Sequence, residues 1–252
     1  MERYKLLEVC TISQQEMSVS MNKKQSVLMV VLAFILMLPS LAQAQDSEFG
    51  NWLVYIGSKK LNTKWNLHNE IQYRNYNAVG DLEQLLLRTG IGYNLTENNN
   101  NLLLGYGYIA SENYVGNTDD KITVNEHRIF QQFTTKQKVG KIGLTHRYRF
   151  EQRFVESDFK ARLRYFLALK IPLAKSNTSE EDGEEQQPSK FYFSTYNEIF
   201  LNTKFSVFDR NRVYGGLGYQ LNKNVRIEAG YMNQIFEASS RDQFNLITFV
   251  NF

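Results

Sequence analysis

The chain ends with the stretch Asp242-Gln-Phe-Asn-Leu-Ile-Thr-Phe-Val-Asn-Phe252. Side chains of a strand alternate between two faces, and one face here holds Phe244, Leu246, Thr248, Val250 and Phe252. The other face is polar and holds Gln243, Asn245 and Asn251. Outer-membrane barrels close by pairing their last strand with their first, so a terminal strand with one apolar face favours that class. We expect Val250 and Phe252 to be the signal that barrel-assembly machinery recognises during insertion.

Residues 21–44 have the three parts of a secretory signal peptide: a basic start at Met21–Lys24, the apolar run Val27–Leu38 and the small-x-small site Ala42–Ala44. The apolar run would span about 18 Å as a helix, which is too short for a hydrocarbon core of roughly 30 Å. We therefore expect an exported chain that begins near Gln45. Residues 1–20 are interpreted as an over-extended gene start or, alternatively, as a long basic region of the signal.

Composition excludes several classes of function. The single cysteine, Cys10, lies in the expected leader, so disulfides, thiol catalysis, cysteine-ligated metals and a lipid-anchored cysteine are not expected in residues 45–252. A net charge of +3 is too small to indicate a nucleic-acid partner. No segment after the signal approaches 18 consecutive apolar residues, so a membrane-embedded chain would have to cross as a closed barrel.

Residues 45–252 alternate as strands that are separated by turn signals, and no linker divides them. The sequence predicts eleven candidate strands: 49–57, 64–76, 84–94, 101–111, 121–135, 141–154, 159–173, 190–202, 210–221, 224–236 and 242–252. The alternation of 121–135 does not define which face is which. The segment 175–189 holds an acidic cluster and is expected to be a solvated, mobile loop. Because bacterial single-chain barrels have even strand numbers, we prefer twelve strands, with ten as the fallback.

The residue types on the two faces distinguish a barrel in lipid from a soluble one. One face of most strands is Leu, Ile, Val, Tyr and Phe, and tyrosines lie near the strand ends, as in an interfacial girdle. An arginine facing the bilayer midplane costs about 2–4 kcal/mol, so the charged face must point into the lumen, where Arg and Glu can pair. The expected lumenal residues are Glu70, Arg74, Arg88, Arg147, Arg149, Glu151, Arg153, Arg162, Arg164, Glu198, Arg212, Arg226 and Glu228.

The predicted fold class is therefore an all-β, antiparallel, up-and-down transmembrane β-barrel whose lumen is filled by Arg, Glu and Tyr side chains. Several stretches resemble the domain-of-unknown-function 2490 family of Bacteroidetes-type bacteria: His146–Arg153, Arg162–Tyr165, Asn197–Asn202, Asn211–Tyr219 and Gly230–Gln234, with Trp52 and the Glu70/Arg74 strand. The resemblance covers 46–252. It implies an outer-membrane barrel and no activity, ligand or catalytic residue.

Candidate catalytic and metal-binding residues are few. His68, His127 and His146 lie on separate predicted strands without metal-ligand spacing, so no metal and no cofactor are expected. A hydrolase could be assembled from Ser194 near Glu198 and His146 near Glu151, but no local nucleophile signature supports it. The glycine run 215–218 lies within a predicted strand and indicates curvature or close packing against Arg or Tyr side chains rather than a nucleotide loop.

These observations predict a non-catalytic barrel in the outer membrane of a Gram-negative bacterium. Its role would be structural, or that of a narrow, anion-preferring pore. The expected partners are outer-membrane lipid and, during insertion, the assembly machinery. Two alternatives stay open: an outer-membrane lipid hydrolase or acyltransferase, and a soluble periplasmic β-domain that binds a ligand.

Overall fold

A computed structural model describes residues 49–252 except 79, 97–98, 117, 174–188 and 205. The expectations for residues 1–20, for the signal peptide at 21–44 and for nearly all of the acidic loop at 175–189 lie outside the described residues. In the described part, no helix has the length and hydropathy needed to cross a bilayer.

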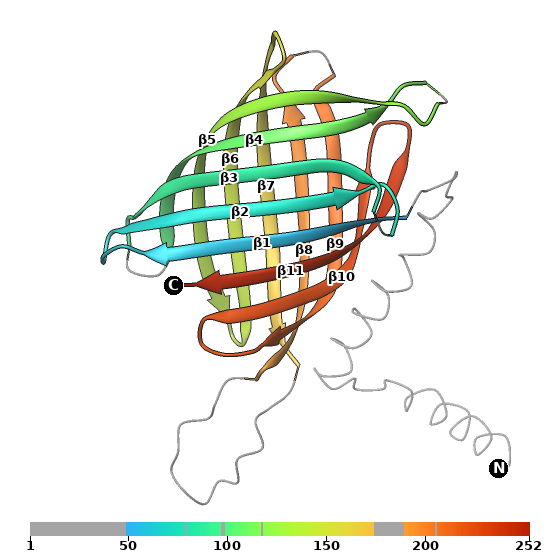
Figure 1. The fold of residues 1–252 in the computed structure, drawn as a ribbon. Helices are drawn as coiled ribbons and strands as arrows, with labels where there is room; N and C mark the ends of the chain where they lie inside the picture. Colours follow the sequence, from blue (N-terminus) through green and yellow to red (C-terminus); the bar gives the residue numbers. More distant parts are fainter. Residues whose placement is uncertain (1–48, 79, 97–98, 117, 174–188, 205) are drawn as a thin grey trace, which may run out of the picture. The chain divides into compact units, whose positions relative to one another are not determined.

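The described residues form one closed β-barrel, which confirms the predicted fold class (Figure 1). Each strand is hydrogen-bonded to its neighbours in sequence, so the chain runs up and down around the wall. The strands are β1 (Gly50–Lys60), β2 (Trp65–Asn75), β3 (Leu82–Asn94), β4 (Asn100–Tyr114), β5 (Lys121–Val139), β6 (Ile142–Val155), β7 (Asp158–Pro172), β8 (Phe191–Asn202), β9 (Phe208–Gln220), β10 (Val225–Ile235) and β11 (Ser240–Asn251).

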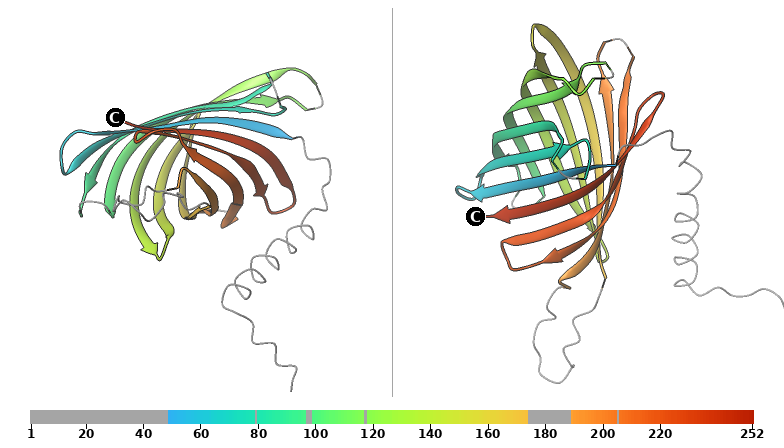
Figure 2. Two further views of the ribbon diagram at one scale, coloured as in Figure 1. Left: turned by 90° about the horizontal axis from the view of Figure 1, so that it is seen from below. Right: turned by 45° about the vertical axis from the view of Figure 1, so that its right-hand side comes forward.

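The barrel closes through β1 and β11, which lie side by side in both views of Figure 2. This pair is parallel, with Gly50 opposite Gln243 and Ser58 opposite Asn251, whereas all other neighbours are antiparallel. Eleven strands are therefore described, in place of the preferred twelve or the fallback of ten. An even number is required only when the closing pair is antiparallel, and a parallel seam removes that requirement.

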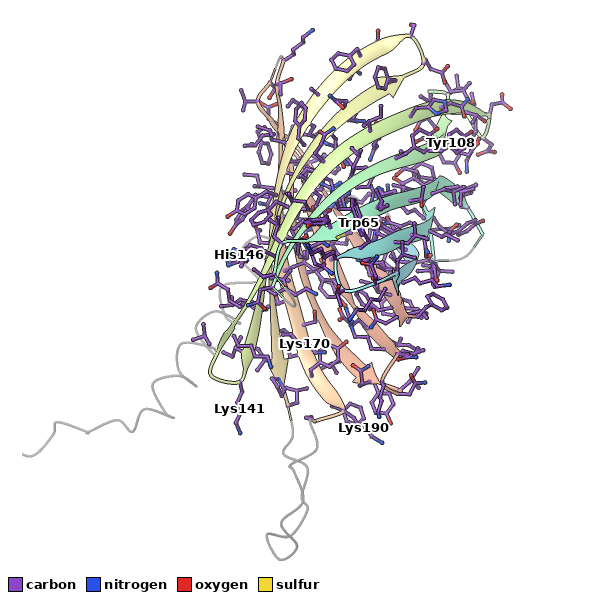
Figure 3. All side chains as sticks on the ribbon, turned by 90° about the vertical axis from the view of Figure 1, so that its left-hand side faces the viewer. Trp65, Tyr108, Lys141, His146, Lys170 and Lys190 are labelled. Carbon is purple, nitrogen blue, oxygen red and sulfur yellow. The ribbon has the colours of Figure 1, made fainter. Side chains whose placement is uncertain are left out.

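The wall has two chemically different faces because successive side chains point to opposite sides. Three consecutive leucines of β4 show this plainly. Leu102 is 46% exposed and Leu104 55%, but Leu103 between them is 6% exposed and faces the lumen. Side chains project from both sides of the strands in Figure 3. The outward face is mostly Leu, Ile, Phe and Tyr, and the inward face holds the buried Arg and Glu side chains.

The strand β1 departs from this pattern. Trp52 and Val54 are 4% and 8% exposed and face the lumen, while Leu53 is 46% exposed on the outer side. With Tyr214, Met232 and Ile247 they form an apolar cluster inside the barrel, beside the seam. The expectation of an apolar outward face was made for most strands and does not extend to β1. Apolar side chains occur on both faces of this strand, so alternation alone could not orient it.

Two of the turns at one end of the barrel have the same hydrogen-bond pattern. The β1–β2 and β9–β10 turns share one device, in which an asparagine oxygen accepts hydrogen bonds from two backbone N–H groups ahead of it, as in Asx turns. Asn62 accepts from Lys64 and Trp65 (2.9 and 2.8 Å), and Asn222 accepts from Asn224 and Val225 (both 2.9 Å). We call this end the C-terminal rim, because the Phe252 N–H donates to Ser58 O (2.8 Å) there.

Glycines in β9 and β10 allow tyrosine rings to lie against the inner wall. A Cβ added to Gly218 would lie 2.1 Å from the Tyr192 ring, and one added to Gly216 would meet Tyr214. Both rings are almost fully buried. The glycine run therefore serves close packing against tyrosine, as the sequence indicated.

Gly218→Ala tests this packing. The added methyl group overlaps the Tyr192 ring, and we expect the free energy of unfolding in detergent micelles to fall by about 1–3 kcal/mol, the usual cost of overpacking. Gly143→Ala is the matched control, because its nearest neighbour would be Lys170 Cβ at 3.8 Å, an ordinary contact. Equal urea midpoints for Gly218→Ala and the wild type would contradict the packing described.

Candidate functional site

The lumen is occupied by a network of arginine and acidic side chains, which is the candidate site. Its centre is Glu151, which is fully buried. Arg162 Nη2 lies 2.7 Å from Oε2, and Arg164 Nη1 lies 2.5 Å from Oε1. Arg149 Nη1 is 3.6 Å from the same carboxylate. The β6–β7 register creates this cluster, because it sets Glu151 opposite Arg162 and Arg149 opposite Arg164.

A second carboxylate, Glu198 on β8, is shared among three arginines. Its Oε1 accepts from Arg164 Nη2 (2.6 Å) and from Arg147 Nη2 (2.7 Å). Arg212 Nη1 is more distant, at 3.9 Å from Oε2. Arg164 therefore joins the two carboxylate centres. Charge-assisted contacts of this kind fix the guanidinium planes.

Two further acidic centres are Glu126 on β5 and Glu70 on β2. Glu126 accepts from Arg128 Nε and Arg153 Nε, both at 2.5 Å. Glu70 accepts from Arg88 Nη1 at 2.8 Å and from the Gln72 side-chain amide. Seven arginines but only five glutamates are buried in the described part of the barrel. The network is therefore richer in cations than in anions.

Aromatic rings in the lumen lie against the arginine side chains. The guanidinium of Arg149 lies 4.4 Å above the centroid of Phe130. Phe200 is contacted by Arg164 at 4.4 Å and by Arg212 at 4.6 Å. A ring face attracts a cation through its quadrupole, and this attraction strengthens where water is excluded. Buried rings thus offset part of the missing negative charge and fill the lumen.

All thirteen residues expected in the lumen lie on inward positions, but their partners differ. Arg226 is the least enclosed, with 30% of its side chain exposed; it lies 3.7 Å from Glu228 and stacks on Phe249. Sequence reasoning missed Glu126, Arg128, Gln132, Asp209 and Gln234. Gln72, Gln243 and Asn245 follow from the polar faces of their strands, although they were not in the expected charged set. Glu126 and Arg128 belong to β5, whose facing the sequence left undefined.

The hydrolase candidates are not brought together. Ser194 is an inward residue of β8, whereas His146 is an outward residue of β6 that contacts Tyr165 Oη through Nδ1 at 2.9 Å. Glu151 lies on the inner side of β6, opposite in facing to His146. Within the described ranges, no group of three His, Cys, Asp or Glu side chains is arranged to hold a metal ion.

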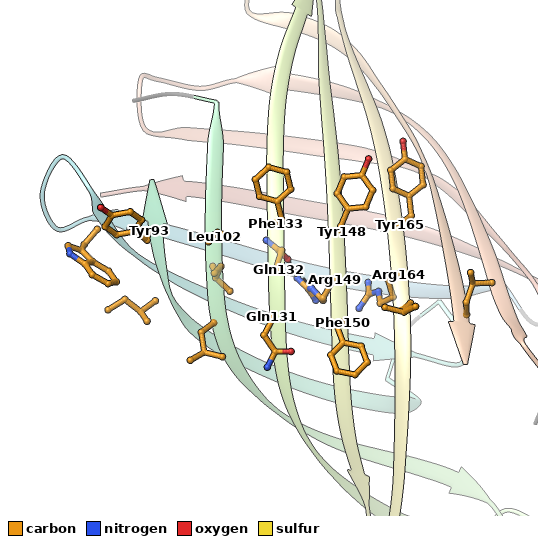
Figure 4. A pocket seen from close by; sticks show the side chains of 16 residues that line it. Tyr93, Leu102, Gln131, Gln132, Phe133, Tyr148, Arg149, Phe150, Arg164 and Tyr165 are labelled. Carbon is orange, nitrogen blue, oxygen red and sulfur yellow. Dashed lines mark hydrogen bonds between the residues drawn. The ribbon is translucent and has the colours of Figure 1, made fainter. Parts of the chain in front are cut away.

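The outer wall carries a groove of about 860 Å³ over β2 to β8 (Figure 4). Phe133, Tyr148 and Tyr165 form a row across three neighbouring strands, with ring centroids 6.4 and 5.0 Å apart. Trp65 and Tyr93 pair at 4.9 Å on the same lining. Trp65 and Tyr93 lie at strand ends on the C-terminal rim, whereas Tyr148 and Tyr165 lie near the middle of β6 and β7.

Glu151→Gln tests the role of the central carboxylate. The change keeps the shape but leaves Arg162 and Arg164 buried without this counter-charge. Removing one partner of a buried pair is strongly destabilising, and we expect the free energy of unfolding in micelles to fall by about 3–5 kcal/mol. Glu237→Gln, at an exposed position, should change it by less than about 0.5 kcal/mol. A Glu151→Gln barrel as stable as the control would show that the network does not depend on this charge.

Comparisons with known proteins identify the family of this chain. The model of the family described as "Protein of unknown function (DUF2490)" matches residues 49–245. An uncharacterized protein of Methylorubrum extorquens is 30% identical over 168 residues, which are 66% of this chain and 69% of that protein. Among solved structures, LpxR from Salmonella typhimurium is similar with a TM-score of 0.46 and 15% identity, covering 86% of this chain and 95% of that one. This chain belongs to the DUF2490 family.

Proposed function

We propose that this protein is a non-catalytic barrel of the Gram-negative outer membrane, whose arginine-rich lumen forms a narrow, anion-preferring path. The observation that carries the proposal is the sidedness of the wall. Outward side chains such as Leu104, Leu163 and Leu217 are at least half exposed, whereas the charged side chains are enclosed. Soluble monomers rarely expose apolar patches larger than a few hundred Å², and here such residues recur on every strand.

Strand length supports a membrane location. The shortest strands, such as β1 and β2, have 11 residues, which corresponds to about 36 Å at roughly 3.3 Å per residue. A strand tilted by about 45° needs 9–11 residues to cross a hydrocarbon core. Trp65 and Tyr93 lie at strand ends on the C-terminal rim, where an interfacial aromatic girdle would be placed. Every described strand is therefore long enough to span the bilayer.

The lumenal charge supports anion preference over cation preference. Arginine stays charged at any physiological pH, and its excess over buried carboxylates gives the interior a positive potential that attracts anions. Large buried side chains, among them Tyr192, Tyr214, Phe130 and Phe200, occupy much of the lumen. A wide aqueous channel is inconsistent with this filling, so the path would be narrow.

The proposal is tested first by location. The full chain should fractionate with outer membranes and migrate faster on a denaturing gel before boiling than after it, because a folded barrel resists detergent at room temperature. A chain that stays in solution without detergent and shows no heat-dependent migration would favour the soluble periplasmic alternative.

Selectivity is tested in planar bilayers under a potassium chloride gradient. We expect a small conductance whose reversal potential lies toward that of chloride. Arg147→Gln, which removes a lumenal charge with 24% of its side chain exposed, should reduce this preference, whereas Lys223→Gln in the exposed β9–β10 turn should not. A potassium-directed reversal potential, or turnover of phospholipid or lipid A by the purified barrel, would contradict the proposal.

A further inference from the structure

In the described barrel, one part of the lumen holds two buried guanidinium groups without a close carboxylate and two buried N–H donors without a hydrogen-bond partner. It lies at the parallel seam, near the end of the barrel opposite the C-terminal rim. Trp52 on β1 is flanked by Arg74 on β2 and reaches Arg212 on β9. The guanidinium carbon of Arg74 lies 3.6 Å from the centroid of the indole ring, and that of Arg212 lies 4.8 Å from it. Two buried cations therefore share one aromatic ring.

Neither arginine has a close carboxylate of its own. In the described part of the chain, Arg74 has no acidic side chain within 4 Å and donates only to Gln72 and Gln84. Arg212 donates to Gln234 (2.8 Å), and its nearest carboxylate, Glu198, lies 3.9 Å away and is already bonded to two other arginines. Both arginines are 7% exposed. Buried charges are normally paired, and leaving two like charges unpaired is costly.

Two neutral N–H donors in the same region have no hydrogen-bond partner among the described residues. Trp52 Nε1 and Gln243 Nε2 are buried without a hydrogen-bond partner in the described structure. Gln243 is joined to Arg212 through Gln234, whose amide donates to Gln243 Oε1 at 2.9 Å. An indole N–H can only donate. Buried donors are normally hydrogen-bonded, and a bound anion would accept from these donors and from both guanidinium groups.

We propose that Arg74, Arg212, Trp52 and Gln243 form a binding site for a small oxyanion of the phosphate or carboxylate type. Such an anion offers several acceptor oxygens, which guanidinium forks bind in bidentate fashion, and it supplies the charge that the seam lacks. The inference rests on the proposed anion-preferring lumen and deepens it, because it assigns one place where an anion would stop.

The test uses the full-length barrel in detergent micelles, with inorganic phosphate as the probe. The chain has two tryptophans, so a Trp65→Phe background leaves Trp52 as the only tryptophan, whose emission is excited selectively over that of tyrosine. At constant ionic strength, with a bulky sulfonate as the replacement anion, phosphate should change the fluorescence along a saturable curve. Acetate, added in a second arm, should compete if carboxylates bind as well; saturation by phosphate alone would restrict the site to phosphate-type anions.

Arg74→Gln and Arg212→Gln should each weaken phosphate binding at least about tenfold. Arg226→Gln is the matched control, because it removes a lumenal guanidinium that already has Glu228 nearby and stacks on Phe249, and it should leave the affinity unchanged. If a charge variant fails to fold, Trp52→Phe takes its place, because it removes the N–H group and keeps an aromatic ring. Phosphate binding to this variant, measured by calorimetry, should also be weaker than binding to the parent.

Two results would overturn the inference: no saturable response in the folded parent barrel, or equal weakening by Arg226→Gln, which would indicate diffuse attraction rather than a site. These results are separable from failure of the proposed function. A barrel that shows the heat shift and chloride preference but no phosphate saturation contradicts only the seam site. Phosphate saturation in a chain that never reaches the outer membrane contradicts only the proposed function.

Discussion

The structure depends on one constraint: guanidinium groups must be kept away from the apolar side of a wall that is one strand thick. Period-two alternation accomplishes this on almost every strand, and closure of the wall makes the separation complete. Arg149 and Tyr148 are adjacent in sequence, yet the first is 3% exposed within the lumen and the second is 50% exposed on the outside. A shift of one residue in register would exchange these environments along a whole strand.

The many guanidinium groups enclosed in the lumen need counter-charges, and this need determines how the acidic side chains are arranged. Carboxylates are shared rather than paired singly: Glu151 serves Arg162 and Arg164, and Glu198 serves Arg164 and Arg147. Aromatic rings such as Phe200 stabilise part of the remaining positive charge through cation–π contacts. The seam, where β1 meets β11, is the region in which this compensation is least complete. The least compensated charges of the lumen therefore lie where the barrel closes.

Much of the fold could be predicted from sequence because β6 and β7 alternate cleanly between aromatic or leucine side chains and arginine. The prediction was incomplete where both faces carry the same kind of residue. On β5, Gln131 faces outward and Gln132 inward, so polarity gave no facing for Glu126 or Arg128. On β1, both Trp52 and Leu53 are apolar. Ion-pair partners could not be predicted either, since contacts such as Arg147 with Glu198 join strands that are not neighbours.

The central claim, that hydrocarbon contacts one face of the wall and not the other, is tested most directly on the three leucines of β4. In a Cys10→Ser background without other cysteines, Leu102→Cys, Leu103→Cys and Leu104→Cys would each carry a spin label in lipid bilayers. Lipid-dissolved oxygen should relax the labels at 102 and 104 strongly and the label at 103 weakly. Equal accessibility to oxygen at all three positions, or preferential relaxation of 102 and 104 by a water-soluble nickel complex, would contradict the account.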